Sequence, residues 1–378
     1  MIKVVVKDRY LNVRVGKPRL NAPCYQYIAP GSEIEVDGKL YPGDPFEKNS
    51  FWLKDGADNY YWSGGVSGLP VKDDQFSSAA TYAWFKSMQI DQIWQEYGTK
   101  GRNVTVAVID SGYSVSNPFL KGRVLDGDRY SSLAKNPELP TAEEIDDNDV
   151  DAHGNRCASL VGALSTPNST LGIAPECRLL IAKIYENQVI NNNQYLEDAI
   201  KWAIDKGADI ISCSLKLSIT AAGANALDQR IKALVGNKPV LLLAAAGNTI
   251  KNLAKVDFYP ACMSTFESIG GATLDGHINS STAINGKTFI YAPGKDVESY
   301  GPGNLPTPDS GTSFSTPIVA GIAALAMSYL KSHNIPIIKD DFLKMLRENG
   351  PLQNDIPAPP ERRFINPSQL FQKLKSLI

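Results

Sequence analysis

The chain has 378 residues, of which 43% are apolar and 21% are charged, and this is an ordinary globular composition. Its length predicts roughly two to three domains with a sizeable core. The formal net charge of -2 and the pI near 6.0 leave no basic excess, which argues against nucleic acid or an anionic membrane as the main partner.

The start of the chain has no recognisable secretion signal, because charged residues interrupt the apolar ones in MIKVVVKDRY. No continuous apolar run approaches the length of about 18–20 residues that spans a bilayer. The longest run, near Ile318, is broken by Gly321. The five cysteines are odd in number and form no C-x-x-C pair, which fits reduced thiols better than a disulfide frame or a zinc site. We therefore expect a cytoplasmic protein.

Residues 1–70 are predicted to form a small all-β domain. Short alternating segments such as KVVV, SEIEVDG and NYYWSGGV are separated by Gly, Pro, Asn and Asp at turn positions. The segments LNVR, APGSEIEVDGKLYPGDPF, FWLK and YYWSGGVS resemble a bacterial SH3-like barrel. This resemblance implies a domain that binds a peptide or protein ligand, inhibits, or localises the chain.

Residues 71–87 are predicted to be a linker, and residues 88–378 an α/β domain. Apolar runs without alternation, which are typical of strands buried on both faces of a parallel sheet, alternate with helical segments. The runs are VTVAVI, LLIAKI, DIISC and VLLLAAA, and the helical segments include QYLEDAIKWAIDKG and NALDQRIKALVGN. A helix over Asp340–Glu348 and the amphipathic end SQLFQKLKSLI are expected to dock on this domain.

Two segments early in the α/β domain carry candidate chemistry. The run VAVIDSG places Asp110 at the carboxyl end of a buried strand, where open α/β sheets collect their sites. A lone strand-end aspartate before Ser-Gly is also a common turn former. His153 opens the helical segment HGNRCASLVGAL, and it is the best candidate base among three histidines, because His277 and His333 fall in a loop and at a polar helix end.

Two later segments complete the set. Asn248 follows the strand LLLAAAGN, where its amide can donate to a developing oxyanion or simply form a turn. The stretch SGTSFSTPIVAG, residues 310–321, holds five hydroxyl residues ahead of an apolar run. Alone, such a stretch is more often a helix cap than a catalytic segment, and Pro317 suits the helix start. A nucleophilic serine there needs a neighbouring base to activate it.

Together VAVIDSG, HGNRCASLVGA, AAAGN and SGTSFSTPIVAG resemble the Asp, His, oxyanion and Ser motifs of the subtilisin-like serine proteases, the subtilases, in the chain order of that family. The resemblance covers roughly residues 88–335. It implies a three-layer α/β/α domain with a mainly parallel sheet. It also implies Ser313 as nucleophile, His153 as general base, Asp110 as the group that orients and charge-stabilises His153, and Asn248 as oxyanion donor.

The segment after DIISC departs from the family pattern. Ser214 and Leu215 match the substrate-binding segment, but Lys216 and Leu217 replace its glycines and are expected to narrow the cleft. Lys216 then either favours acidic residues in the substrate or points to solvent. The opposite wall of the substrate-binding cleft is expected to consist of the small residues Ala245, Ala246 and Gly247, which suit a backbone lying close by.

An acidic run, EEIDDNDVDAHG, precedes His153. The family resemblance allows structural calcium there, but the spacing matches no EF-hand loop, and a solvated loop is the competing interpretation. Asp149 or Asp151 in this run can instead raise the pKa of His153 or select basic substrate residues. No cofactor is required for the expected chemistry.

The sequence therefore predicts a serine endopeptidase that cuts a protein or peptide substrate through an acyl-enzyme, with restricted or regulated specificity. The competing hypothesis is an SH3-like binding protein with a degenerate protease scaffold. An esterase or peptide ligase on the same site uses the same covalent chemistry and cannot be told apart by these residues.

Overall fold

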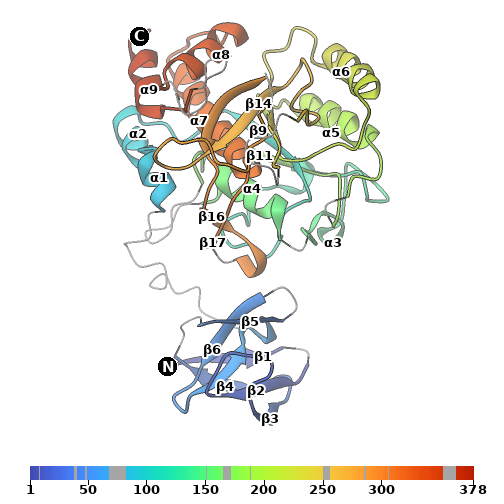
Figure 1. Ribbon diagram of the computed structural model, residues 1–378, viewed down its shortest axis with the longest axis vertical. Helices are drawn as coiled ribbons and strands as arrows, with labels where there is room; N and C mark the ends of the chain where they lie inside the picture. Colours follow the sequence, from blue (N-terminus) through green and yellow to red (C-terminus); the bar gives the residue numbers. More distant parts are fainter. Residues whose placement is uncertain are drawn as a thin grey trace. The chain divides into compact units, whose positions relative to one another are not determined.

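The structure, a computed structural model (Figure 1), describes residues 1–7, 9–37, 41–46, 49–67, 82–149, 151–164, 172–187, 189–249, 256–284, 287–304, 306–351 and 363–378. The contacts within the chain divide it into two compact units, of which the first ends at Ala80 and the second begins at Thr81. Each unit is described separately below.

The first unit is built from two antiparallel sheets. The order of strands is β4-β1-β8 in one sheet and β3-β2-β7-β6-β5 in the other. The strands are β1 (Ile2–Val6), β2 (Leu11–Val15), β3 (Cys24–Ile28), β4 (Glu33–Val36), β5 (Tyr41–Phe46), β6 (Asn49–Lys54), β7 (Asn59–Trp62) and β8 (Val66–Ser67), and the 3-10 turn η1 (Ser63–Gly65) precedes β8.

Alternating residues of these strands form the core of the first unit. Val4 and Val6 of β1 pack with Leu11 and Val13 of β2 in one cluster, and this spacing of two is what places successive side chains on opposite faces of a strand. The small all-β architecture agrees with the prediction, while the resemblance to an SH3-like barrel stays a prediction.

The second unit contains a seven-stranded sheet in which every neighbouring pair is parallel, with the order β10-β11-β9-β12-β13-β14-β15. The strands are β9 (Thr105–Asp110), β10 (Arg129–Ser131), β11 (Arg178–Lys183), β12 (Ile210–Cys213), β13 (Leu241–Ala245), β14 (Glu267–Ala272) and β15 (Thr288–Pro293). The central strands are buried along nearly their whole length, as their unbroken apolar runs predict.

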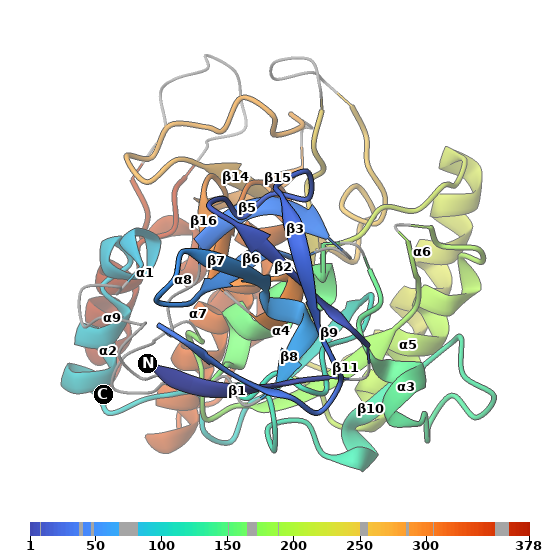
Figure 2. The same cartoon turned by 90° about the horizontal axis from the view of Figure 1, so that it is seen from below.

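Helices cover both faces of this sheet. On one face lie α5 (Gln194–Asp205) and α6 (Ala221–Val235), whose apolar sides share a core cluster with residues of β9, β11 and β12. Figures 1 and 2 show them on the side away from α7 (Thr312–Ser332) and α2 (Ile90–Tyr97). α4 (His153–Gly162) packs beside α7 on that second face. The three-layer α/β/α architecture therefore agrees with the sequence prediction.

The remaining elements sit around this body. They are α1 (Ala83–Ser87), η2 (Asp126–Asp128), α3 (Ala142–Ile145), β16 (Val297–Tyr300), η3 (Pro302–Asn304), β17 (Pro306–Asp309), α8 (Lys339–Glu348) and α9 (Pro367–Lys375). α9 contacts α2 and α7, so the end of the chain docks as predicted.

The predicted linker at residues 71–87 needs a correction at its end. Its earlier part lies outside the described residues, but its last five residues form α1. Trp84 and Phe85 of α1 are buried, and the indole of Trp84 donates to the carbonyl of Glu298 at 3.2 Å. These residues belong to the second unit, in whose core the two large aromatic side chains are buried.

α7 is long and apolar enough to cross a membrane by length and composition, although Gly321 interrupts its continuous apolar run. Of its most apolar stretch, 94% is buried inside the unit, where α7 packs against β12, β13, β14 and β15. A helix that is apolar on every side is what a central core position selects.

Candidate active site

Two glycines bring the start of α4 against the loop that follows β9. A side chain at Gly154 would place its Cβ only 2.3 Å from the carbonyl oxygen of Gly112, so only glycine allows this approach. Gly112 itself has a φ of 106°, which favours glycine. Ala152, immediately before α4, has a φ of 50°, a left-handed conformation that costs an ordinary residue roughly 1–2 kcal/mol. This local geometry places His153 beside Asp110.

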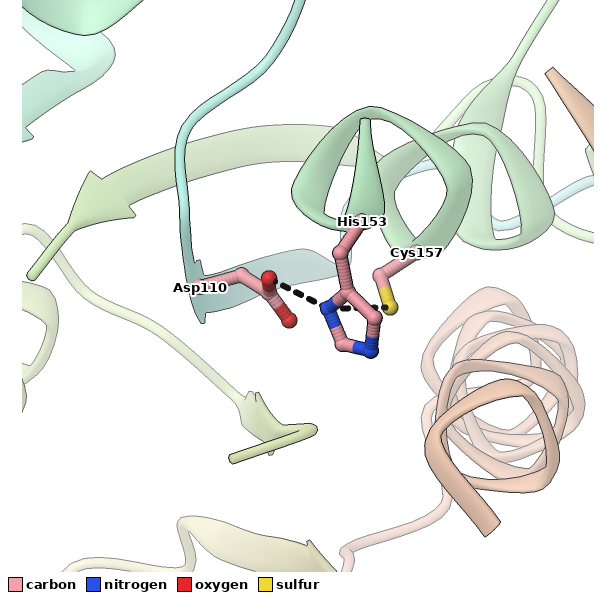
Figure 3. A group of neighbouring side chains, drawn as sticks. All are labelled: Asp110, His153 and Cys157. Atoms are coloured by element: carbon pink, nitrogen blue, oxygen red, sulfur yellow. Dashed lines mark hydrogen bonds and ion pairs between the residues drawn. The ribbon is translucent and has the colours of Figure 1, made fainter. Parts of the chain in front are cut away.

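The Asp110 carboxylate and the His153 imidazole form a short hydrogen bond. Nδ1 of His153 lies 2.7 Å from Oδ1 of Asp110, and Figure 3 shows the second ring nitrogen turned away from the carboxylate. Asp110 is fully buried, whereas the His153 side chain keeps 20% of its surface exposed. The backbone N–H of Ser111 also donates to Oδ1, at 2.8 Å. An imidazole held in this way by Nδ1 leaves Nε2 free to accept a proton.

The phenol of Tyr185 completes this hydrogen-bonded group. Its hydroxyl donates to Oδ1 of Asp110 at 2.7 Å and lies 3.1 Å from Nδ1 of His153. Tyr185 comes two residues after β11, whose last residue, Lys183, is paired with Asp110 across the sheet. Neighbouring parallel strands end at the same edge, which explains how a residue so distant in sequence reaches this carboxylate.

Ser313 is the second residue of α7, where the backbone N–H groups have no partner within the helix and the helix dipole favours negative charge. α7 begins at Thr312, so Pro317 lies inside the helix and not at its start, which corrects the prediction. Because proline has no N–H, the carbonyl of Ser313 loses its usual helical partner. Ser214 Oγ donates to that carbonyl at 2.7 Å instead, and Cys157 Sγ lies 3.5 Å from it.

Asn248 is fixed by the first residue of α7. The backbone N–H of Thr312 donates to Oδ1 of Asn248 at 3.0 Å, and the Thr312 hydroxyl donates to it at 3.2 Å. With Oδ1 held by these two donors, the amide nitrogen Nδ2 is the group left to donate to a ligand. Asn248 is exposed and lines the same cavity as Ser313 and His153.

This cavity has a volume of about 560 Å³ and opens beside the residues described above. Of the predicted substrate-binding residues, Ser214, Leu215, Lys216 and Gly247 line it. Ala246 is fully buried and does not line it, whereas Ala245, which was expected in the same wall, does. Successive side chains of a strand point to opposite sides, which accounts for the difference of one residue.

The two residues that replace glycines point in different directions. Leu217 is 3% exposed and packs in the core with α5 and α6, so it does not narrow the cavity as predicted. Lys216 is exposed, lines the cavity, and holds its Nζ 4.7 Å from the centre of the Phe258 ring. The Phe258 ring in turn packs so closely on Gly247 that a Cβ there would lie 2.2 Å from it. Lys216 and Phe258 are therefore neighbours in the wall of the cavity.

The acidic run before His153 makes more hydrogen bonds and is more buried than a solvated loop would be. Glu144 and Thr141 form a capping box at the start of α3, and the carbonyl of Asp146 accepts from the buried Nζ of Lys183 at 2.7 Å. Asp147 accepts the backbone N–H of Asn155 in the first turn of α4, at 2.7 Å. Asp149 is only 4% exposed. These contacts employ several carboxylates of the run as local acceptors.

Burial and neighbouring charges shift the pKa values of several groups at the site. Burial lowers the pKa of His153, but the charge of Asp110, together with Cys157 and the hydrogen bond to Asp110, raises it well above its ordinary value. Burial also raises the pKa of Asp147 to about 6, and the charge of Asp110 adds to this shift.

Cys157 lies one helical turn after His153, with its Sγ 4.0 Å from Nδ1 (Figure 3). In the described part of the chain, Asp110, His153 and Cys157 form the one group whose potential metal-ligand atoms lie close together, within 4.8 Å of one another. Burial raises the pKa of the Cys157 thiol to about 11, so it stays protonated near neutral pH. Metal binding requires a thiolate, and the imidazole nitrogen in this group already binds Asp110, so we do not assign these residues as metal ligands.

Sequence reasoning missed three residues of the site. Tyr185 had one available signal, its position just past a buried strand of a parallel sheet. Thr312 is adjacent to Ser313 and was interpreted only as a cap or packing residue, although it fixes Asn248. Phe258 lies in an irregular segment, and nothing in the sequence places it against Lys216.

Comparisons with known proteins agree with this arrangement. A model described as the subtilase family matches residues 101–346. An intracellular serine protease of Paenibacillus polymyxa is 32% identical over 63% of this chain and 70% of its own length. The major intracellular serine protease of Bacillus subtilis is 28% identical over 65% of this chain and 74% of its own length.

Two solved structures share the fold. The prenylagaramide maturation protease PagA has a TM-score of 0.61 at 24% identity, over 75% of this chain and 98% of that chain. A mutant of the protease domain of PatA has a TM-score of 0.59 at 26% identity, over 74% of this chain and 98% of that chain.

Proposed function

The chain belongs to the subtilase family and is a serine-type endopeptidase, and from this premise we propose that it cuts an extended segment of an intracellular protein with restricted specificity, using Asp110, His153 and Ser313 as its catalytic triad. The observation that carries the assignment is the 2.7 Å hydrogen bond between Asp110 and His153, because His153 lines the same cavity as Ser313. Two of the relatives are named intracellular proteases, which supports a cytoplasmic location.

In the proposed reaction, His153 Nε2 takes the proton of the Ser313 hydroxyl while the hydroxyl oxygen attacks the carbonyl carbon of the substrate. Asp110 holds the imidazole by Nδ1 and stabilises its positive charge. His153 then returns the proton to the leaving amine, and water repeats the sequence on the acyl-enzyme. No step requires a metal ion or an organic cofactor.

The oxyanion of the tetrahedral intermediate is proposed to bind two donors. One is Nδ2 of Asn248, whose amide is held in place by Thr312, and the other is the backbone N–H of Ser313 in the first turn of α7. Both donors are fixed before substrate arrives, so little reorganisation accompanies the development of charge.

The proposal of restricted substrate specificity rests on Lys216 and Phe258, which lie side by side in the wall of the cavity. Among the described residues that line the cavity, the ionisable side chains are the Lys216 cation, the His153 imidazole and the Tyr185 phenol, and none is a carboxylate. An acidic substrate side chain entering this cavity meets a favourable charge, and a basic one is repelled. The sequence left Lys216 between this role and a solvent-facing one, and its place in the cavity wall favours the former.

The experiment for the activity is labelling with a fluorophosphonate, which reacts with activated serines. Wild type and a control subtilase should be labelled, and Ser313→Ala should not be. Absence of label on the wild type beside a labelled control would reject the triad assignment and favour the alternative of a binding protein on a degenerate scaffold.

The experiment for specificity compares peptides that differ only by Glu, Gln or Lys next to the cleaved bond. We expect the Glu peptide to have the highest kcat/KM, and Lys216→Glu to reverse the order. Lys232→Ala, which removes an exposed lysine of α6, serves as the control. Rapid digestion of unfolded casein at many unrelated sites would contradict restricted specificity, and mapping of new N-termini in cells that carry wild type or Ser313→Ala would identify the substrate.

The first unit is proposed to act as a binding domain, in line with its resemblance to an SH3-like barrel. A small cavity of about 130 Å³ is lined by Tyr10, Phe46 and Trp62, with Arg14 beside them. Phe46 and Trp62 contact edge to face, with ring centroids 5.0 Å apart. Such an aromatic surface suits a peptide or protein ligand.

We do not propose structural calcium in the acidic run before His153, because carboxylates of this run already accept hydrogen bonds from neighbouring groups of the chain.

A further inference from the structure

Tyr185 is a buried polar side chain of the site to which the proposed mechanism gives no role. It is 6% exposed, and part of it lines the cavity. Its hydroxyl lies 2.7 Å from Oδ1 of Asp110 and 3.1 Å from Nδ1 of His153, and Nδ1 itself lies 2.7 Å from Oδ1. The three atoms form a closed triangle.

Two of these atoms carry hydrogen and one does not. A base at Nε2 of His153 requires the tautomer in which Nδ1 is protonated, so Nδ1 is a donor. The phenol is also a donor, because burial, with the charge of Asp110 adding to it, raises the pKa of Tyr185 well above its ordinary value. The carboxylate oxygen of Asp110 is the one acceptor for both. The tyrosine and the histidine therefore compete for the same lone pairs.

We propose that Tyr185 is a positioning residue that, by sharing Oδ1 of Asp110 with His153, weakens the hold of the carboxylate on the protonated imidazole and sets the pH above which His153 acts as a base. The inference rests on the proposed function, because it takes His153 as the general base. Without the phenol, Asp110 interacts more fully with the imidazolium, and the protonated form of His153 persists to higher pH.

Other titratable groups around His153 do not account for such a change. Burial raises the pKa of Cys157, on the same helix, to about 11, so its thiol stays protonated near neutral pH, and burial raises the pKa of Asp147, in the loop before α4, to about 6. From the remaining packed segments, the ring of Phe314 on α7 is uncharged, with its centroid 5.9 Å from that of His153, and Lys216 lies across the cavity against Phe258. All of these groups are unchanged when only the phenol oxygen of Tyr185 is removed.

The test is an NMR titration of the imidazoles in histidine-labelled full-length protein. The chain has three histidines, and His277 and His333 are exposed, so they serve as internal references. The titration is made in the Ser313→Ala background, which prevents self-digestion, with and without Tyr185→Phe. We expect the midpoint of His153 to rise by about one pH unit in the Phe variant, while the other two stay in place.

Tyr130→Phe is the matched control. Tyr130 is also a buried tyrosine of the same unit, at 7% exposure on β10, and its ring packs against that of Trp202, with the centroids 5.3 Å apart. It should leave the His153 midpoint unchanged. A Tyr185→Phe variant that folds, by its thermal unfolding transition, and whose His153 midpoint equals that of the parent would overturn the inference.

Kinetics with active Ser313 provide the second readout. Tyr185→Phe keeps the ring that lines the cavity, so KM should hold while kcat falls about tenfold below the new midpoint and recovers at high pH. A fall in kcat that is equal at every pH would contradict the proposal. If wild type shows neither activity nor label at Ser313 but the His153 midpoint still rises, the proposed function fails while the link between Tyr185 and His153 stands.

Discussion

At the scale of single residues, Asn248 has two separable roles. Its Oδ1 accepts from Thr312 and thereby fixes the side chain, and its Nδ2 is the proposed oxyanion donor. Asn248→Ala removes both, and we expect kcat to fall by about 10²–10³ with little change in KM. Asn248→Asp keeps the acceptor and removes the donor, so it should be impaired as well. Steady-state kinetics on one peptide measure both variants, and near-normal turnover of Asn248→Asp would refute the donor role.

A second residue-scale prediction concerns pH. The base must be neutral to accept a proton, and the pKa of His153 is raised, so kcat/KM should rise with pH through a midpoint above the ordinary histidine value of about 6.5. Asp110→Asn removes the main charge that raises this pKa and leaves burial, which lowers it. The midpoint should then fall, and so should the maximal rate. An NMR titration of His153 checks the first expectation, and a pH-rate profile checks both.

The functional residues of the site could be predicted from the sequence where they lie within a recognisable sequence motif. Asp110, His153, Asn248 and Ser313 each stand in a local pattern of small residues and strand or helix ends, so the sequence points to them. Tyr185 and Phe258 stand in no such pattern, and their contacts arise from strands and loops that meet only in the folded chain. Ala246 shows the limit of a motif, because a change of one residue along a strand reverses the direction of the side chain.

At the scale of elements, the long buried strands and the amphipathic helices were predictable from periodicity, as β9, β11, β12 and β13 show. β14 was not, because its sequence, ESIGGA, has too few apolar residues to stand out. The start of α7 was placed too late, because Pro317 was taken as a first-turn residue. Tertiary contacts to the carbonyl of Ser313 allow the helix to begin at Thr312 instead.

The Ser313 carbonyl accepts from Ser214 in place of the N–H that Pro317 lacks, and this predicts an energetic coupling between Ser214 and Pro317. Ser214→Ala leaves the carbonyl of Ser313 without its 2.7 Å donor and should lower the free energy of unfolding by about 1–3 kcal/mol. Pro317→Ala restores a backbone N–H at the helical position, so the same change should be smaller in that background. Denaturant unfolding of the wild type, both single variants and the double variant measures the coupling. Additive effects would contradict it.

At the scale of the whole molecule, the two units have separate cores, one of β-strands and one of the seven-stranded sheet with its helices. Since the proposed triad and oxyanion donors lie in the second unit, we expect a chain without residues 1–80 to fold and to cleave a short peptide at a rate close to that of the full chain. Ser313→Ala in the shortened chain is the control. A soluble but inactive shortened chain would assign the first unit a direct part in catalysis.

The burial of α7 has a consequence for the lifetime of the enzyme in solution. Ser313 is carried by a helix that is 94% buried along its apolar stretch, so a molecule can cut only while folded. It can be cut in its core segments only while unfolded. Self-digestion therefore needs an encounter between one folded and one unfolded molecule. The loss of intact enzyme should be second order in protein concentration and fastest near the midpoint of thermal unfolding. Dilution should lengthen the half-life of wild type on warming and leave that of Ser313→Ala unchanged.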